Sequence, residues 1–135
     1  MYNKNSLQRG DIVYPELSYL IVGCLYETYN ELGGGYQEKH YQKALAKNFI
    51  NHNINFISQA PYLIKFKGEI IGKYYTDFII ENRVVLEIKK GNYFVRSNIK
   101  QVLNYLQATD KKLGILANFT NNGIKYIRIL NVEKR

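Results

Sequence analysis

Two acidic residues and one lysine stand out in an otherwise apolar stretch near the middle of the chain. Asp77 lies in one run of β-branched and aromatic residues, and Glu87 and Lys89 lie in the next. Alternate residues of a strand point to one face, so Glu87 and Lys89 should emerge together while Leu86 and Ile88 point into a core. Charges on a half-buried sheet face cost stability unless they are paired or bind a metal. The pattern therefore indicates that these charged residues form a metal-binding or catalytic site.

This set of side chains suits phosphodiester hydrolysis. A divalent cation such as Mg²⁺ or Mn²⁺ binds hard oxygen ligands and lowers the pKa of a bound water. Asp77 and Glu87 could supply two carboxylates, and the carbonyl of Ile88 a further ligand. Lys89 would place a cation near the attacking water. Without metal, two carboxylates about 4 Å apart repel each other by roughly 4 kcal/mol at an effective dielectric of about 20, so the site should bind metal.

The loop between the two runs decides whether the carboxylates can meet. Directly opposed residues on paired strands share a face, so Asp77 and Glu87 converge only if the hairpin pairs positions separated by an even number. A two-residue loop would send them to opposite faces. We therefore expect a loop with an odd number of residues centred on Asn82, whose side chain tolerates a left-handed backbone, or else a β-bulge.

Length and charge limit the classes of protein to which this chain can belong. The 135 residues suffice for one domain, 1–135, with residues 1–13 expected to form a loose N-terminal tail. The lone Cys24 excludes an internal disulfide and a cysteine zinc cluster. No apolar run reaches membrane-spanning length and no signal-peptide core is visible, so a cytoplasmic protein without a membrane partner is expected. The formal net charge of +8 is the balance expected of a protein that binds nucleic acid.

Hydrophobic periodicity predicts an α/β protein with a mixed sheet. In three segments the apolar residues recur at helical spacing. In six others apolar and polar residues alternate, as they do in strands. Helices are expected over residues 15–32, 36–51 and from a cap at Ser97 or Asn98 through Leu106; strands are expected over residues 54–59, 62–67, 70–80, 84–90, 113–119 and 125–130.

Four ordered motifs in this pattern resemble the PD-(D/E)xK nuclease superfamily, and in particular the small bacterial group of GxxExxY proteins. They are GYQEKHY at residues 35–41, the Asp77-Phe78 pair, the Glu87-Ile88-Lys89 triplet with QVLNYL at 101–106, and GILANF at 114–119. The similarity covers about residues 15–130. One departure is that Thr76 replaces the proline of the motif, which binds no metal.

The resemblance implies a restriction-endonuclease-like αβββαβ core, with a mixed sheet flanked by helices. It implies that Asp77 and Glu87 are metal ligands and that Lys89 lies beside the nucleophilic water. In exonuclease-like branches, a Gln-x-x-x-Tyr pair lines the active site, and Gln101 and Tyr105 have that spacing. Both should lie more than about 90° from the middle of the apolar face of their helix, so simple solvation is the alternative.

Several further residues are candidates for the same site. Glu38 could compensate a helix dipole, but it shares a stripe with Tyr41 and Leu45 and should face the sheet. It is therefore expected to be an additional metal ligand or an acid behind the ligands. Three basic residues that follow the catalytic strand are candidate phosphate contacts: Lys90, Arg96 and Lys100.

These observations favour a Mg²⁺- or Mn²⁺-dependent nuclease that uses an activated water, with DNA expected as substrate ahead of RNA. The alternative is a non-catalytic module on a nuclease-like scaffold that binds nucleic acid or protein, because fold does not fix function. Loss of catalysis should first appear as a missing Asp, Glu or Lys in the motif, and none is missing.

Overall fold

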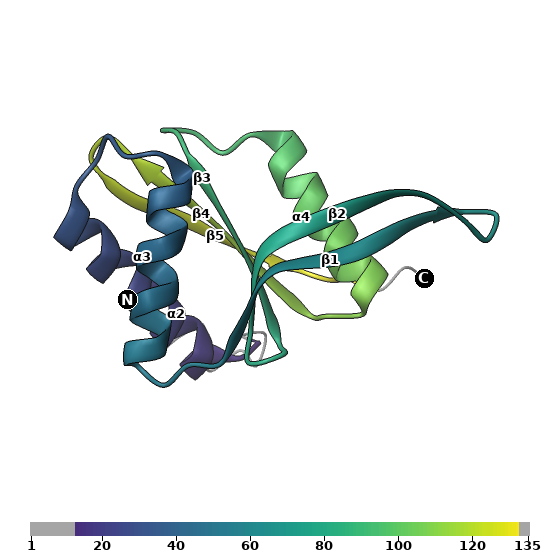
Figure 1. The fold of residues 1–135 in the computed structure, drawn as a ribbon, viewed down its shortest axis with the longest axis horizontal. Helices are drawn as coiled ribbons and strands as arrows, with labels where there is room; N and C mark the ends of the chain where they lie inside the picture. The colour runs from purple at the N-terminus through teal and green to yellow at the C-terminus, as the bar shows by residue number, and fades with distance from the viewer. Residues whose placement is uncertain (1–12, 133–135) are drawn as a thin grey trace.

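A computed structural model describes residues 13–132 of the chain (Figure 1). The expected loose tail, except for residue 13, lies outside the described residues. The elements in chain order are α2 (Pro15–Leu32), α3 (Glu38–Asn51), β1 (Phe56–Phe66), β2 (Glu69–Ile80), β3 (Val84–Lys90), α4 (Arg96–Thr109), β4 (Leu113–Thr120) and β5 (Gly123–Leu130). Across these residues, no helix has the length and apolarity that crossing a membrane requires.

The strands form one mixed sheet in the order β1-β2-β3-β4-β5. Neighbouring strands are antiparallel except β3 and β4, which are parallel and joined through α4. This arrangement confirms the expected restriction-endonuclease-like α/β fold.

Helices cover both faces of the sheet. On one face α2 and α3 pack against side chains that include Phe78, Leu86 and Ile88, and Cys24 lies buried within that core. On the other face α4 packs against a second cluster around Val85 and Leu116. In Figure 1, α2 and α3 lie together at the left, and α4 lies apart from them. The sheet is therefore buried in its centre, and polar side chains there need partners.

A glycine lets α4 approach the sheet closely. A Cβ built on Gly114 of β4 would lie 2.5 Å from Cγ1 of Val102 on α4, which is well inside van der Waals contact. Only a residue without a side chain allows the helix to sit at this depth.

The β2–β3 hairpin has the geometry that convergence of the acids requires. Its register runs from Ile80↔Val84 to Phe78↔Leu86, so the loop holds three residues centred on Asn82. Asn82 is left-handed with φ 56°. The expected odd-numbered loop is confirmed. Beyond Phe78↔Leu86 the two strands separate, and Figure 1 shows β2 and β3 diverging from this point.

Two expected strands, 54–59 and 62–67, are one strand, β1. The expected segments left Ala60 and Pro61 outside a strand, and a proline lacks the N–H that a ladder needs. Pairing nevertheless continues through Ala60↔Thr76 and Pro61↔Tyr75, since β1 is the edge strand and leaves one side unpaired. Together with β2 it forms a hairpin arm that projects to the right in Figure 1.

The third helix begins earlier than expected. We expected a cap at Ser97 or Asn98, but α4 starts at Arg96 with Val95 in the N-cap position and no side-chain cap hydrogen bond. The carbonyl of Val95 accepts the N–H groups of Asn98 and Ile99 instead.

Candidate active site

Asp77 and Glu87 meet where β2 and β3 separate. Each carboxylate accepts a hydrogen bond from the backbone of the other strand: Glu87 Oε1 from the Asp77 N–H at 3.0 Å, and Asp77 Oδ2 from the Ile88 N–H at 2.8 Å. The carboxylates thus join the strands beyond their last backbone pair. The expected convergence of the two acids is confirmed.

Asp77 is held from three elements. Besides the Ile88 amide of β3, its Oδ1 accepts from Gln42 Nε2 of α3 at 2.7 Å and lies 3.5 Å from Gln59 Nε2 of β1. Burial and, after it, the neighbouring Glu87 raise the pKa of the Asp77 carboxyl to about 7, and the Ile88 amide and Lys89 partly oppose this shift. Near neutral pH, this carboxyl is therefore poised between its two protonation states.

Glu87 is only 5% exposed and is surrounded by donors. Its Oε1 accepts from Thr76 Oγ1 at 3.1 Å, and its Oε2 accepts from the Tyr74 hydroxyl at 3.0 Å. Burial and the nearby Glu87 raise the pKa of Tyr74, so its hydroxyl stays protonated and can donate. Lys89 Nζ lies 3.7 Å from Glu87 Oε2.

The donor set fits a divalent cation. Two buried carboxylates, each disfavouring the charge of the other, have one lysine to offset them, and hard oxygens are what Mg²⁺ and Mn²⁺ bind. The N–H and C=O of one strand residue point to the same edge. The carbonyl of Ile88 therefore faces the gap in which its N–H bonds Asp77, and it can serve as a further oxygen.

Glu38 does not join this pair. Its Oε2 accepts the backbone N–H of Lys90 at 3.1 Å, which ties the start of α3 to the end of β3. Within residues 13–132, no three acidic, histidine or cysteine side chains come together as a metal cluster. Glu38 thus faces the sheet as expected, but the structure does not bring it into a three-carboxylate group.

Gln101 and Tyr105 occupy different environments. Gln101 is exposed, and its Oε1 lies 3.3 Å from the Tyr74 hydroxyl, which links it to Glu87. Tyr105 is 1% exposed, and its hydroxyl donates to the Ala60 carbonyl. The expectation that Tyr105 lies off the apolar face of the helix was wrong, because α4 packs beneath both the sheet and the β1–β2 arm. Tyr105 supports the ring of Tyr74, 6.2 Å away, instead of lining an open site.

Three expected phosphate contacts lie on the surface beside the site. Lys90 ends β3, and Arg96 and Lys100 lie one turn apart at the start of α4. All three are exposed, and within residues 13–132 none of them forms an ion pair.

Sequence reasoning missed Tyr74, Thr76, Gln42 and Gln59. Gln42 could have been found, because it follows Glu38 by one helical turn and so shares its face. The role of Tyr74 depends on how the arm twists over α4, which no local pattern encodes.

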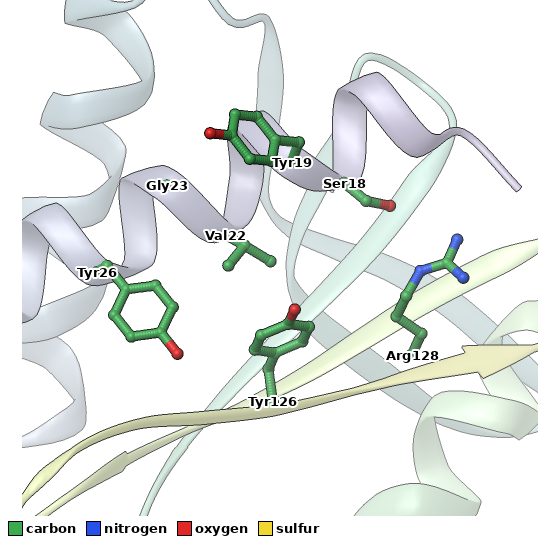
Figure 2. Close-up of a pocket in the computed structure, with 7 residues that line it drawn as sticks. All are labelled: Ser18, Tyr19, Val22, Gly23, Tyr26, Tyr126 and Arg128. Carbon is green, nitrogen blue, oxygen red and sulfur yellow. The ribbon is translucent and has the colours of Figure 1, made fainter. Parts of the chain in front are cut away.

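A cavity of about 290 Å³ lies elsewhere, between α2 and β5. Figure 2 shows Tyr126 and Arg128 rising from β5 toward Val22 and Ser18 of α2. None of the site residues described above lines it, and its lining contains no carboxylate. It is not the place where metal-dependent chemistry would occur.

Comparison with known proteins gives distant relatives. The ATP-dependent DNA helicase Rep of Escherichia coli (strain K12) is 25% identical over 105 residues, and so is the Rep helicase of Salmonella typhimurium. The match covers 77% of this chain but only 14% of each helicase, so the chain spans a small part of the length of these relatives.

Two solved structures are also similar. The crystal structure of SSO0001 matches with a TM-score of 0.51 and 16% identity, covering 87% of this chain and 78% of that one. The alkaline exonuclease LHK-Exo from Laribacter hongkongensis matches with a TM-score of 0.48 and 11% identity, covering 85% and 82%. At this identity, the likeness to SSO0001 concerns the fold.

The family is shown by a match along nearly all of the described chain. The family model of the PD-(D/E)XK nuclease superfamily matches residues 15–129, a range that includes β1 to β4, all of β5 but its last residue, the paired carboxylates and Lys89. The chain belongs to the PD-(D/E)XK nuclease superfamily.

Proposed function

We propose that this chain is a single-domain nuclease that hydrolyses phosphodiester bonds with Mg²⁺ or Mn²⁺, and that its substrate is DNA in preference to RNA. One observation carries the proposal: two buried carboxylates from neighbouring strands converge, with a lysine Nζ 3.7 Å from one of them. Family membership supports the nuclease activity; the metal and the choice of DNA are our inference.

The mechanism assigns separate tasks to the residues of the site. A divalent cation, when bound, would stabilise charge on the phosphate and lower the pKa of water. Asp77, Glu87 and the Ile88 carbonyl would hold it. Lys89 is partly exposed, so its ammonium can reach from Glu87 toward solvent. There it can donate a hydrogen bond to the attacking water and offset the negative charge that develops in the transition state. No covalent intermediate is needed.

Surrounding residues keep the pair in place. Tyr74 and Thr76 both donate to Glu87, which fixes the carboxylate without neutralising it. Thr76 stands where the family motif has proline, and here it contributes a hydrogen bond. We assign Glu38 to positioning the end of β3, and Gln101 to contact with substrate beside Tyr74.

Two finer points belong to the same proposal. We infer that the chain is a GxxExxY protein, on the motif from Gly35 to Tyr41. We also infer that Lys90, Arg96 and Lys100 contact phosphates, because they are exposed and follow the catalytic strand. The rival function, a non-catalytic binding module, would need no intact Asp, Glu and Lys set.

The proposal is tested by incubating labelled single-stranded, duplex and branched DNA and RNA with Mg²⁺, Mn²⁺ or EDTA. Cleavage should require metal. Lys89→Ala should abolish cleavage while leaving nucleic-acid binding and melting temperature nearly intact. Lys47→Ala, an exposed lysine on α3, is the matched control and should cut normally. Binding by the wild type without any cleavage would establish the rival module; normal cleavage by Lys89→Ala would defeat the mechanism.

A further inference from the structure

Tyr93 is held in solvent beside the candidate site. It lies in the loop of residues 91–95, between β3 and α4, and is 81% exposed, more than any other large apolar side chain within residues 13–132. An exposed aromatic ring gains nothing from burial. Its position in the segment that directly follows Lys89 and Lys90 suggests that it meets the substrate.

The loop that carries this ring is firmly attached to the sheet. The N–H of Gly91 donates to the Phe119 carbonyl at 3.1 Å. Asn92 Oδ1 accepts the N–H of Asn121 at 3.0 Å, and the Asn92 carbonyl accepts from Lys125 Nζ at 3.1 Å. Hydrogen bonds to β4, to the β4–β5 turn and to β5 therefore fix the backbone just before the ring.

Tyr93 itself is anchored by a buried residue. Its carbonyl accepts from Nδ2 of Asn118 at 2.8 Å, and Asn118 is 2% exposed. Asn118 lies opposite Lys89 in the β3–β4 register. The residue paired with the catalytic lysine thus also holds the backbone of Tyr93, so the start of the Tyr93 side chain has a defined place relative to the site.

Positive charge surrounds the ring. Lys125 Nζ lies 5.8 Å from the Tyr93 ring centroid. Residues 88–109 contain four basic residues and no acidic one. Aromatic rings interleaved with such a basic track are the features by which proteins hold single-stranded nucleic acid, through stacking on the bases and contact with the phosphates.

The distance to the site suits one substrate strand. Tyr93 follows Lys89 by four residues, so their Cα atoms lie at most about 14 Å apart. Stacked nucleotides advance by about 3.4 Å along one strand. A strand whose phosphate lies at Lys89 can therefore bring a base to Tyr93 within a few nucleotides.

We propose that Tyr93 is a stacking platform for an unpaired base of the substrate, and that this nuclease prefers nucleic acid with a single-stranded segment at the cleavage site. The inference rests on the proposed nuclease function and narrows its substrate class. An unpaired base can offer its face to a protein ring, whereas the bases of an intact duplex are already stacked on one another.

The test compares Tyr93→Ala and Tyr93→Phe with the wild type, with Tyr26→Ala on α2 as the control for loss of an exposed tyrosine. Binding to single-stranded and duplex DNA is measured by fluorescence anisotropy with Ca²⁺ in place of Mg²⁺. Tyr93→Ala should weaken single-strand binding by roughly 5- to 150-fold, the range expected for loss of one stacked base. Duplex binding should stay unchanged. Tyr93→Phe should restore single-strand binding, because it keeps the ring.

A second readout reports stacking directly. The fluorescence of 2-aminopurine placed near the cleavage position should be quenched on binding to the wild type and to Tyr93→Phe, and not on binding to Tyr93→Ala. Unchanged affinity and quenching with Tyr93→Ala, while the wild type still cleaves, would overturn the stacking inference and leave the nuclease function standing. Equal losses on single strands and duplexes would overturn it too. A wild type that neither binds nor cleaves would overturn both.

Discussion

Asp77 is a buried carboxyl whose charge is disfavoured in the candidate site, since burial and Glu87 together raise its pKa to about 7. Unfolding returns this carboxyl to a pKa of about 3.9. Between about pH 4 and 7, the folded state therefore binds the proton more tightly than the unfolded state does. The free energy of unfolding of the metal-free protein should fall across this window as pH rises, by up to about 4 kcal/mol, and stay level above it.

Asp77→Asn should remove that pH dependence. In EDTA above pH 7, the variant should melt at a higher temperature than the wild type, because one buried charge is gone. Its amide can still accept from the Ile88 N–H, and Gln42 can turn its own amide to pair with the new donor. Glu81→Gln, at the β2–β3 turn, is the control. Thermal melts from pH 4 to 8 measure the effect; a wild-type melting temperature that rises steadily through this range would contradict it.

Residue types and spacing sufficed to predict the central pair. Alternation along the strands placed Glu87 and Lys89 on one face, and the requirement that Asp77 and Glu87 converge predicted the odd-numbered loop, because both depend on local geometry. The donors Tyr74 and Gln59 were not predictable, since their approach depends on the twist of the β1–β2 arm and on a left-handed backbone at Gln59, with φ 52°.

The α3–β3 contact is the element-scale feature that bears most on the site. Glu38, at the first position of α3, accepts from the backbone of Lys90, so the helix fixes the end of the strand that carries Lys89. The hydrogen bond from the Lys90 N–H requires an acceptor oxygen on residue 38, and it does not require that this oxygen be charged. Glu38→Gln should therefore cleave at close to the wild-type rate, with an unchanged Mn²⁺ requirement. The cleavage rate of Glu38→Ala should fall about tenfold, as is typical when a residue that contacts metal ligands is removed.

A metal ligand would behave differently. If Glu38→Gln alone raises the Mn²⁺ concentration needed for cleavage and lowers the rate at least tenfold, Glu38 binds the cation. If both variants cleave normally and only the melting temperature falls, Glu38 merely compensates the helix dipole. Cleavage rates over a series of Mn²⁺ concentrations, with melting temperatures in EDTA, distinguish the three roles.

Element order was largely readable from periodicity, and the differences have physical causes. Residues 60–61 were expected to lie between two strands, but Pro61 continues β1 because an edge strand tolerates a residue without an N–H. Tyr105 was expected off the apolar face, but the arm above α4 widens the surface that the helix buries. Long-range packing, absent from any local window, decides both cases.

At the scale of the whole molecule, the net charge of +8 should govern how nucleic acid binds. Each phosphate contact releases counterions, which gives a log–log salt slope of about −0.9 per contact on duplex DNA and −0.7 on single strands. With contacts from four basic side chains near the site, we expect a slope of about −3 for single-stranded DNA. The four are Lys90, Arg96, Lys100 and Lys125. Affinities from 50 to 200 mM salt measure it, and binding that ignores salt would indicate a protein partner instead.

The account as a whole depends on a divalent cation bound by Asp77 and Glu87. Titration of the protein with Mn²⁺, followed by the electron paramagnetic resonance signal of the free ion, tests this most directly. The wild type and the control Glu81→Gln should bind Mn²⁺ at one site, and Asp77→Asn should bind it at least tenfold more weakly despite folding at least as well. A wild type that leaves Mn²⁺ free at millimolar concentration, or equal binding by Asp77→Asn, would contradict the account.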